Sequence, residues 1–434
     1  MAVSTQLPHL TDLVVHQILR FVPTKVAVRM MFVSKQWEGV WFLDPILDFD
    51  EGTGHYQHNH DQHEKFIKFV NNILKRYLEF CDQKQKHSAA KRFRLCMMSY
   101  LSGDAPSVDK WLSLLFERIS VEELDISLLV RGVDKLLQGD LENYYSLSRK
   151  TLINAKSLTS LQLECVTIKH MDEYRSSLSP IKEAMVPSAD LISKCLLPSF
   201  KTMSLKTVRF LDKGNQYDCH FDYAALFSLI WECPFIEYLS LTSCCFKNSG
   251  YRQYLCSSSL KFLEIDECNS PELTISEVVN LESFRLVSSS ALEILALIKC
   301  ANLKDVSIFA PRLQALELYG CHDVAVTVLN DVPDLCIINF EGYLKSEISL
   351  KNIENNFYAI TIALLDKWDG ELTTLKSIRD FLENLVRTAE ELVLFIDDFK
   401  AIIFPESFRQ TVNEDHLRSF SSEDLLNEDH LRTF

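Results

Sequence analysis

The sequence predicts an α+β repeat protein, in which three short N-terminal helices precede a curved solenoid of parallel strands with helices or irregular segments on its outer face. Two patterns support this fold class. Apolar residues recur at helical spacing in the first 45 positions, whereas a Leu-x-x-Leu-x-Leu phrase returns from about residue 121 onward. The length of 434 residues suits two or three domains, and the 47% apolar content is enough for large cores.

The segment from Leu10 to Trp41 predicts the three helices. The first has one apolar face at the i, i+3, i+4, i+7 spacing, formed by Val15, Ile18, Leu19 and Val22. Thr11 or Asp12 is its expected N-cap, because either side chain can accept a hydrogen bond from a free N–H of the first turn. Pro23 has no N–H and is expected to end this helix.

A second helix is expected from Lys25 to Phe32, with Thr24 as its cap and Phe32 on its inner side. A third follows, on which Trp37 and Trp41 share one face and hold the helices together. Three helices of this length are too small to enclose a core. Their spare apolar surface therefore packs either on the rest of the chain or on a partner protein, and the pattern alone favours neither.

Five pieces of this segment resemble an F-box in their order and spacing: Ile18-Leu19, Val22-Pro23-Thr24-Lys25, Val28-Arg29, Val33-Ser34-Lys35-Gln36-Trp37 and Trp41. The resemblance implies a module, residues 7–45, that docks on a Skp-family adaptor and through it on a cullin. The residues expected to form the docking face and its supporting core are Leu10, Leu13, Val15, Ile18, Leu19, Val22, Pro23, Val28 and Val33.

Residues 46–90 are expected to link this module to the repeats. The part that begins at Asp48 is polar and predicts a solvated loop, although its histidines offer zinc binding as an alternative: His55, His58, His60 and His63. An apolar stripe then predicts a connecting helix, with Phe66, Phe69, Val70, Ile73, Leu74 and Tyr77 on one face.

The repeated phrase often has a Cys three residues after its last Leu, and its clearest copies are Ile236–Cys244, Leu260–Cys268, Leu292–Cys300 and Leu313–Cys321. Weaker copies are Val121–Leu129, Leu158–Val166, Leu281–Ser289, Leu303–Pro311 and Leu335–Tyr343. The phrase is typical of leucine-rich repeats, because its alternation makes a short strand whose buried face is covered only when repeats stack. We therefore predict a degenerate leucine-rich-repeat solenoid over residues 91–345.

The spacing of the copies is uneven. Those that start at 236, 260 and 281 are one repeat apart, whereas those that start at 281, 292, 303 and 313 are about half as far apart. Either the repeats are very short, or some copies are outer strands within one repeat. The second interpretation is favoured, because Val306–Leu318 fits an outer strand, a turn at Pro311 and the next inner strand.

The thirteen cysteines are an odd number without any C-x-x-C pair, which predicts a reduced intracellular protein. The cysteines that end the four clearest copies are expected to be small buried residues of the turns, without a metal or redox role: Cys244, Cys268, Cys300 and Cys321.

An F-box followed by such repeats is similar to the plant F-box/leucine-rich-repeat family. The resemblance implies a non-catalytic subunit of an SCF-type (Skp–cullin–F-box) ubiquitin ligase in the nucleus or cytoplasm, which needs no cofactor and whose repeats bind a target protein. Some members carry a further FBD module, whose strand Ala389–Asp397 resembles, so residues 346–412 are assigned to a C-terminal module. Residues 413–434 form an acidic tail, in which Asn413–Phe420 returns as Asn427–Phe434 and indicates a tandem duplication.

The target is expected on the concave face of the solenoid. Side chains that alternate with the buried leucines would face it: Phe262, Glu264, Asp266, Arg285, Glu317, Tyr319, Asn339 and Glu341. The acidic bias and the two aromatic rings suit a protein ligand with some basic character, although each residue by itself is better explained as a solvated strand residue.

Other functions find little support. A net charge of −15 without a basic stripe argues against nucleic-acid binding, and no apolar run reaches the roughly 20 residues of a membrane helix. Catalytic and nucleotide-binding motifs are absent, and no polar cluster marks a small-molecule pocket. One alternative remains: the family's opening Leu-Pro falls at Leu10-Thr11, where Pro is absent, so the chain could be a protein-binding scaffold with a degenerate F-box.

Overall fold

The computed structural model describes residues 10–32, 35–43, 46–52, 60–84, 88–130, 143–148, 151–152, 154–169, 199–211, 226, 230, 233–244, 254–255, 257–268, 270–321, 324, 326–330, 332–342, 347–351, 359–364 and 391–396. The chain divides into two compact units, Met1–Ala225 (unit 1) and Leu226–Phe434 (unit 2). Among the described residues, no helix is both long enough and apolar enough to cross a membrane.

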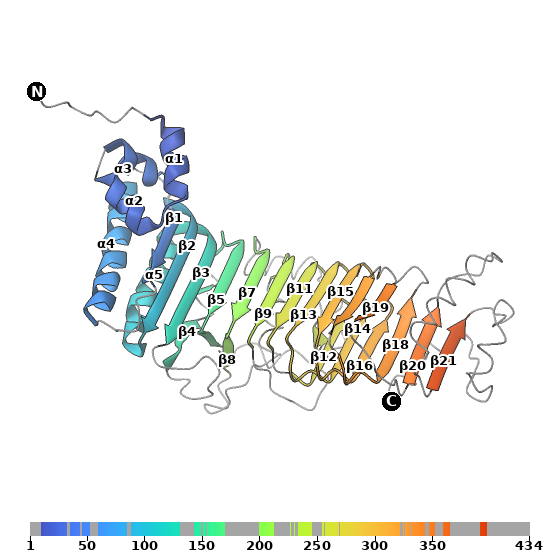
Figure 1. Cartoon of the computed structure of the whole chain (residues 1–434). Helices are drawn as coiled ribbons and strands as arrows, with labels where there is room; N and C mark the ends of the chain where they lie inside the picture. Colours follow the sequence, from blue (N-terminus) through green and yellow to red (C-terminus); the bar gives the residue numbers. More distant parts are fainter. Residues whose placement is uncertain are drawn as a thin grey trace, which may run out of the picture. The chain divides into compact units, whose positions relative to one another are not determined.

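Unit 1 begins with α1 (Asp12–Arg20), α2 (Thr24–Met31) and α3 (Lys35–Trp41), which confirms the prediction of three short helices (Figure 1). Both α1 and α2 pack against α3, and their buried residues are Val15, Leu19, Ala27, Val28, Met31, Val40 and Trp41. Trp37 is only half-buried. The N-cap of α1 is Thr11, one of the two candidates.

Two predictions about the second helix are wrong. The N-cap position of α2 belongs to Pro23, so Thr24 is already the first helical residue and its hydroxyl makes no cap hydrogen bond. Phe32 follows the helix and is 76% exposed, with the Arg76 guanidinium 5.8 Å from its ring centroid, whereas Met31 is buried.

The connecting helix is α4 (His60–Lys84), as predicted. Phe66, Val70, Ile73, Leu74 and Tyr77 are buried, whereas Phe69 is half-buried at the margin of the stripe. Phe42, just after α3, stacks on Phe80 with 4.7 Å between the ring centroids, so the three-helix module packs directly on α4.

The strands of unit 1 run parallel in the order β1 (Ile46–Asp50), β2 (Ser88–Tyr100), β3 (Ile119–Val130), β5 (Ser160–Glu164) and β7 (Thr202–Lys206). The η1 turn (Ser102–Asp104) and α5 (Ala105–Arg118) connect β2 to β3. The loop predicted from Asp48 is therefore wrong at its start, since Leu47 and Phe49 of β1 are fully buried against the neighbouring strand. A smaller parallel sheet contains β4 (Tyr145–Ser148), β6 (Val166–Lys169) and β8 (Arg209–Leu211).

Unit 2 is a coil in which each turn adds one strand to each of two parallel sheets (Figure 1). The first sheet contains β9 (Tyr238–Thr242), β11 (Phe262–Asp266), β13 (Ser283–Val287), β15 (Asp305–Phe309), β17 (Val326–Asn330) and β19 (Glu347–Lys351). The second contains β10 (Tyr254–Leu255), β12 (Glu272–Ser276), β14 (Ile294–Ile298), β16 (Ala315–Tyr319), β18 (Ile337–Gly342), β20 (Ala359–Leu364) and β21 (Glu391–Ile396).

This arrangement explains the uneven spacing of the phrase and confirms the interpretation with two strands per repeat. Ser283 pairs with Asp305 in one sheet and Glu272 with Ile294 in the other, a separation of 22 residues in both cases. All nine copies of the phrase contain strands, and the strand predicted in Ala389–Asp397 is β21. The alternating leucines lie between the two sheets, for example Leu263 and Ile265 of β11 and Leu295 and Leu297 of β14.

The predicted role of the four cysteines in the turns is confirmed. Each follows a residue with positive φ at the end of a strand, namely Ser243, Glu267, Lys299 and Gly320. All four thiols are buried, and each lies 3.3–3.7 Å from a strand carbonyl: Thr242 for Cys244, Leu241 for Cys268, Ile298 for Cys300 and Leu297 for Cys321. The left-handed residue turns the backbone sharply, and the small thiol fits into the bend beneath it.

Candidate functional site

Apolar side chains are unusually exposed on the N-terminal helices. Of the ten large hydrophobic side chains that are exposed in the described residues, six lie on or beside α1–α3: Leu13, Val14, Phe21, Val26, Phe32 and Leu43. Phe21 is 85% exposed and Phe32 is 76% exposed. We call these six residues the apolar docking surface, and their concentration on short helices makes this module the candidate contact site.

The nine residues predicted for adaptor binding divide between a face and a core. Leu13 and Pro23 are exposed, Leu10, Ile18 and Val22 are half-buried, and Val15, Leu19 and Val28 are buried among the helices. Val33 lies outside the described residues. Five members of the docking surface were not predicted from the sequence. Phe32 was assigned to the inner side of its helix, and the available signal for the other four is that they fall outside the apolar stripe.

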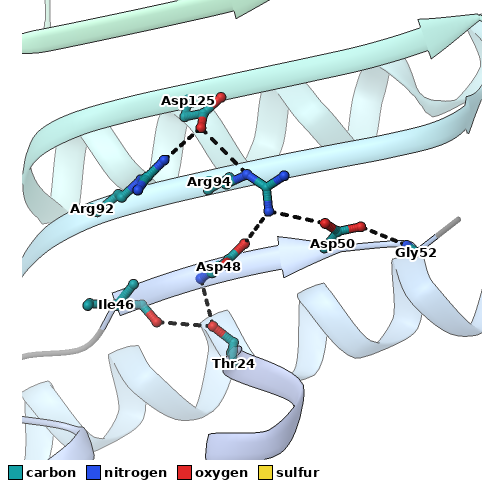
Figure 2. A network of polar contacts seen from close by, with 8 residues as sticks. All are labelled: Thr24, Ile46, Asp48, Asp50, Gly52, Arg92, Arg94 and Asp125. Carbon is teal, nitrogen blue, oxygen red and sulfur yellow. Dashed lines mark hydrogen bonds and ion pairs between the residues drawn. The ribbon is translucent and has the colours of Figure 1, made fainter. Parts of the chain in front are cut away.

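The helical module is attached to the first strand through Thr24 (Figure 2). Its hydroxyl donates to the carbonyl of Ile46 at 3.0 Å and accepts the N–H of Asp48 at 2.6 Å. Thr24 is 1% exposed, whereas Ile46 and Asp48 are half-buried, so the two hydrogen bonds join a buried hydroxyl to the edge of the sheet.

An ionic network continues from this contact across three strands (Figure 2). Arg94 Nη1 donates to Asp48 Oδ1 at 3.0 Å and to Asp50 Oδ2 at 3.1 Å. Asp125 Oδ2 accepts from Arg92 Nη2 at 2.9 Å and lies 3.5 Å from Arg94 Nε. Burial lowers the pKa of the Arg94 guanidinium, but Asp48 and Asp50 outweigh burial and raise the pKa overall, so this cation stays charged.

His63 is the one histidine of the four whose side chain the structure describes, and it lies on α4 instead of in a solvated loop. Its Nδ1 is 2.8 Å from Glu51 Oε1 and its Nε2 is 3.0 Å from Asp104 Oδ2. Since a carboxylate can only accept, both ring nitrogens must carry a proton. Burial lowers the pKa of His63, and the two carboxylates raise it by more, so the net shift is upward from 6.5.

A zinc site is not found among the described residues, where no group of three or more His, Cys, Asp or Glu side chains could hold a metal ion. His55 and His58 lie outside the described residues, as does the side chain of His60.

The eight residues predicted for target binding do not share one face, which corrects the expectation of a single concave set. Phe262, Glu264, Asp266 and Arg285 belong to β11 and β13 of the first sheet, whereas Glu317, Tyr319, Asn339 and Glu341 belong to β16 and β18 of the second. The two sheets bury their alternating leucines against each other, so their outward side chains point in opposite directions. The uneven spacing caused this error, because copies from both sheets were assigned to one inner face.

In the first-sheet group, two carboxylates have described neighbours. Glu264 lies opposite Arg285 in the strand register and accepts a 2.6 Å hydrogen bond from the hydroxyl of Tyr238. Burial and this carboxylate raise the pKa of Tyr238. Burial and the neighbouring Glu267 carboxylate raise the pKa of Asp266 from 3.8.

The comparisons with known proteins agree with this architecture. Residues 194–395 match the family model described as At1g61320/AtMIF1, LRR domain. Among curated relatives from Arabidopsis thaliana, the FBD-associated F-box protein At5g56690 is 29% identical over 53% of this chain and 45% of its own length. The F-box/LRR-repeat protein At3g18150 is 23% identical over 69% of this chain and 51% of its own length. The chain thus spans about half the length of the curated relatives it matches.

Proposed function

The chain belongs to the plant F-box/leucine-rich-repeat family, and on that premise we propose that it is the substrate-recognition subunit of an SCF-type ubiquitin ligase. The observation that carries the proposal is the apolar docking surface on α1–α3. Its exposed side chains are the kind that a protein partner buries, and Phe21 and Phe32 have the size of interface anchors. The partner is a Skp-family adaptor, which in turn binds a cullin.

In this proposal the chain contributes proximity and no reacting group. The strands hold a target protein, and the docked adaptor brings the ubiquitin-charged enzyme to it, so the effective concentration of the two reactants rises. The complex would work in the nucleus or cytoplasm and would require no cofactor, nucleic acid or membrane.

The target is assigned to the outward face of β9, β11 and β13 in unit 2. Phe262 is 43% exposed there, beside the carboxylates of Glu264 and Asp266 and the guanidinium of Arg285. An exposed ring among charged groups gives a protein ligand both apolar area and orientation.

The test is a titration of the purified chain with a Skp-family adaptor by calorimetry. The variant Phe21→Glu/Phe32→Glu changes two exposed side chains and leaves the helical core alone, unlike a change at the buried Leu19. We expect it to weaken binding by at least about thirtyfold, the effect of losing one strong interface anchor. Phe235→Glu is the matched control, since Phe235 is 44% exposed and lies in unit 2.

A wild-type chain that is folded but does not bind any Skp-family adaptor would refute the ligase function. The missing proline at Leu10-Thr11 would then favour the alternative, a leucine-rich-repeat scaffold with a degenerate F-box.

A further inference from the structure

The outer edge of β1 is an open edge of a parallel sheet, where backbone N–H and C=O groups need a partner other than a strand. Among the described strands, β1 pairs with β2 alone, so its second edge has backbone groups without a strand partner. Alternate residues of a strand direct both their N–H and their C=O to the same edge. Glu51 donates its N–H to Cys96 of β2, so Ile46 and Asp48 direct theirs to the open edge.

Thr24 satisfies these groups from α2. Its hydroxyl donates to the Ile46 carbonyl and accepts the Asp48 N–H, two groups that a neighbouring parallel strand would bind through one N–H and one C=O. One hydroxyl therefore stands in for one residue of a missing strand. Thr24 itself is almost fully buried, whereas Ile46 and Asp48 are half-buried, so the hydroxyl binds both groups at the margin of the interior.

Asp48 connects Thr24 to the neighbouring strands of the sheet (Figure 2). Its backbone N–H binds Thr24 on the open edge, while its carboxylate accepts from Arg94 of β2. Arg94 in turn contacts Asp125 of β3. The edge strand β1 is thus held at its open edge by α2 of the three-helix module. At its other edge it is held by the ion pairs of Arg94, which reach β3.

We propose that the three-helix module is also the N-terminal cap of the strand stack in unit 1, with Thr24 as the residue that closes the edge. Stacked repeats need such a cap, because an open edge can pair with other chains. The capping role holds whether or not an adaptor binds. Together with the proposed function, it makes Thr24 a positioning residue, because it fixes the apolar docking surface to the strands of unit 1.

Amide hydrogen exchange of the full chain, followed by mass spectrometry, tests the proposal. In the wild type, the amides of α1–α3 and β1 are expected to exchange at the same rate as those of β2 and β3, because all of them open together. Thr24→Val keeps the shape and removes both hydrogen bonds, so exchange in α1–α3 and β1 should become at least about tenfold faster than in β2 and β3. Thr24→Ser keeps the hydroxyl and should restore the wild-type pattern.

Two results would overturn the capping role. One is a wild type whose α1–α3 amides exchange much faster than those of β2 and β3, a measurement that needs no variant and therefore decides even if Thr24→Val fails to fold. The other is a folded Thr24→Val chain with unchanged exchange at Ile46–Asp50. Neither result depends on the adaptor, whereas loss of adaptor binding with intact coupled exchange would refute only the proposed function.

Discussion

The outward strand faces of the two units differ in how their charged side chains are paired. In unit 1, the carboxylates of Asp48, Asp50 and Asp125 are paired with arginines, and Lys206 lies 3.0 Å from Glu164. In unit 2, no ion pair of the described residues joins outward side chains of β9, β11 and β13. The pairs lie one residue before the strands instead, between Glu237 and Lys261 and between Glu282 and Lys304.

The paired charges on the outward face of unit 1 stabilise the protein, whereas the charges on the outward face of unit 2 can bind a ligand. A carboxylate already paired within the chain gains little from a ligand, because a new cation must displace the old one. Asp266 forms no ion pair among the described residues, and burial and the Glu267 carboxylate raise its pKa by more than a backbone hydrogen bond and Arg285 lower it. The contrast therefore predicts that equal substitutions on the two faces have unequal consequences.

The largest contrast is expected between two phenylalanines on edge and inner strands. Phe49 of β1 is fully buried, so Phe49→Ala should lower the free energy of unfolding by about 3–5 kcal/mol. Phe262→Ala removes a ring that is 43% exposed and should change stability by less than about 0.5 kcal/mol while weakening target binding. Urea unfolding measures both. A loss at Phe262 as large as that at Phe49 would show that the Phe262 ring packs in the core and is not available to a ligand.

Arginine substitutions provide the second contrast. Arg94→Met leaves three carboxylates of β1 and β3 close together without their shared cation and should cost about 1–2 kcal/mol, less at high salt because these groups are partly exposed. Arg285→Met is the matched control in unit 2, where no described ion pair is lost, and it should be nearly neutral. If both variants lose the same stability, the network in unit 1 does not stabilise the fold as argued.

The pH dependence of unit 1 should carry the signature of His63. Because the folded pKa is raised above 6.5, the stabilisation is fully present below pH 6.5 and is lost as the pH rises through the folded pKa. His63→Gln should therefore destabilise the chain by about 1 kcal/mol at pH 5.5 and by less at alkaline pH. Thermal unfolding across this range measures the difference, with Asp104→Asn as a control that removes one of the two negative charges beside the ring. A wild type and a variant with parallel pH profiles would show that the ring is not protonated.

Much of the fold could be predicted from local sequence patterns, and the exceptions have a common cause. The stripe on α4 and the nine copies of the phrase report burial that repeats every few residues, which a sequence displays directly. The strand β1 was missed because Asp48 and Asp50 make it polar, and their partner Arg94 lies more than 40 residues away. The same holds for His63 and Asp104, which are 41 residues apart. Contacts of this range have no periodic trace.

The assignment of strands to sheets was limited for a related reason. Inner and outer strands of unit 2 carry the same Leu-x-Leu alternation, so the pattern predicts that a strand exists without saying which sheet it joins. Only the strand pairing, which repeats every 22 residues, shows that Glu264 and Glu317 belong to different sheets. The exposed Phe21 and Phe32 were missed because an apolar residue is assigned to the core unless a partner surface is already known.

The smallest predicted effect is also the one in which the two faces differ in sign. Removing a paired charge with Asp125→Asn should destabilise the chain by up to about 1 kcal/mol, because Arg92 and Arg94 lose a common negative charge. Asp266 forms no ion pair among the described residues, and Asp266→Asn should stabilise the chain by a few tenths of a kcal/mol at pH 7, since it removes a charge that burial, Glu267 and Glu264 disfavour. The folded pKa of Asp266 is raised above 3.8, so its ionisation opposes folding as the pH rises above that value, and the gain should disappear below it. Chemical unfolding at pH 7 and pH 3.5 measures both variants, and a loss of stability in Asp266→Asn would mean that this carboxylate has a favourable role in the free chain, in which case the face of β11 is not held open for a ligand.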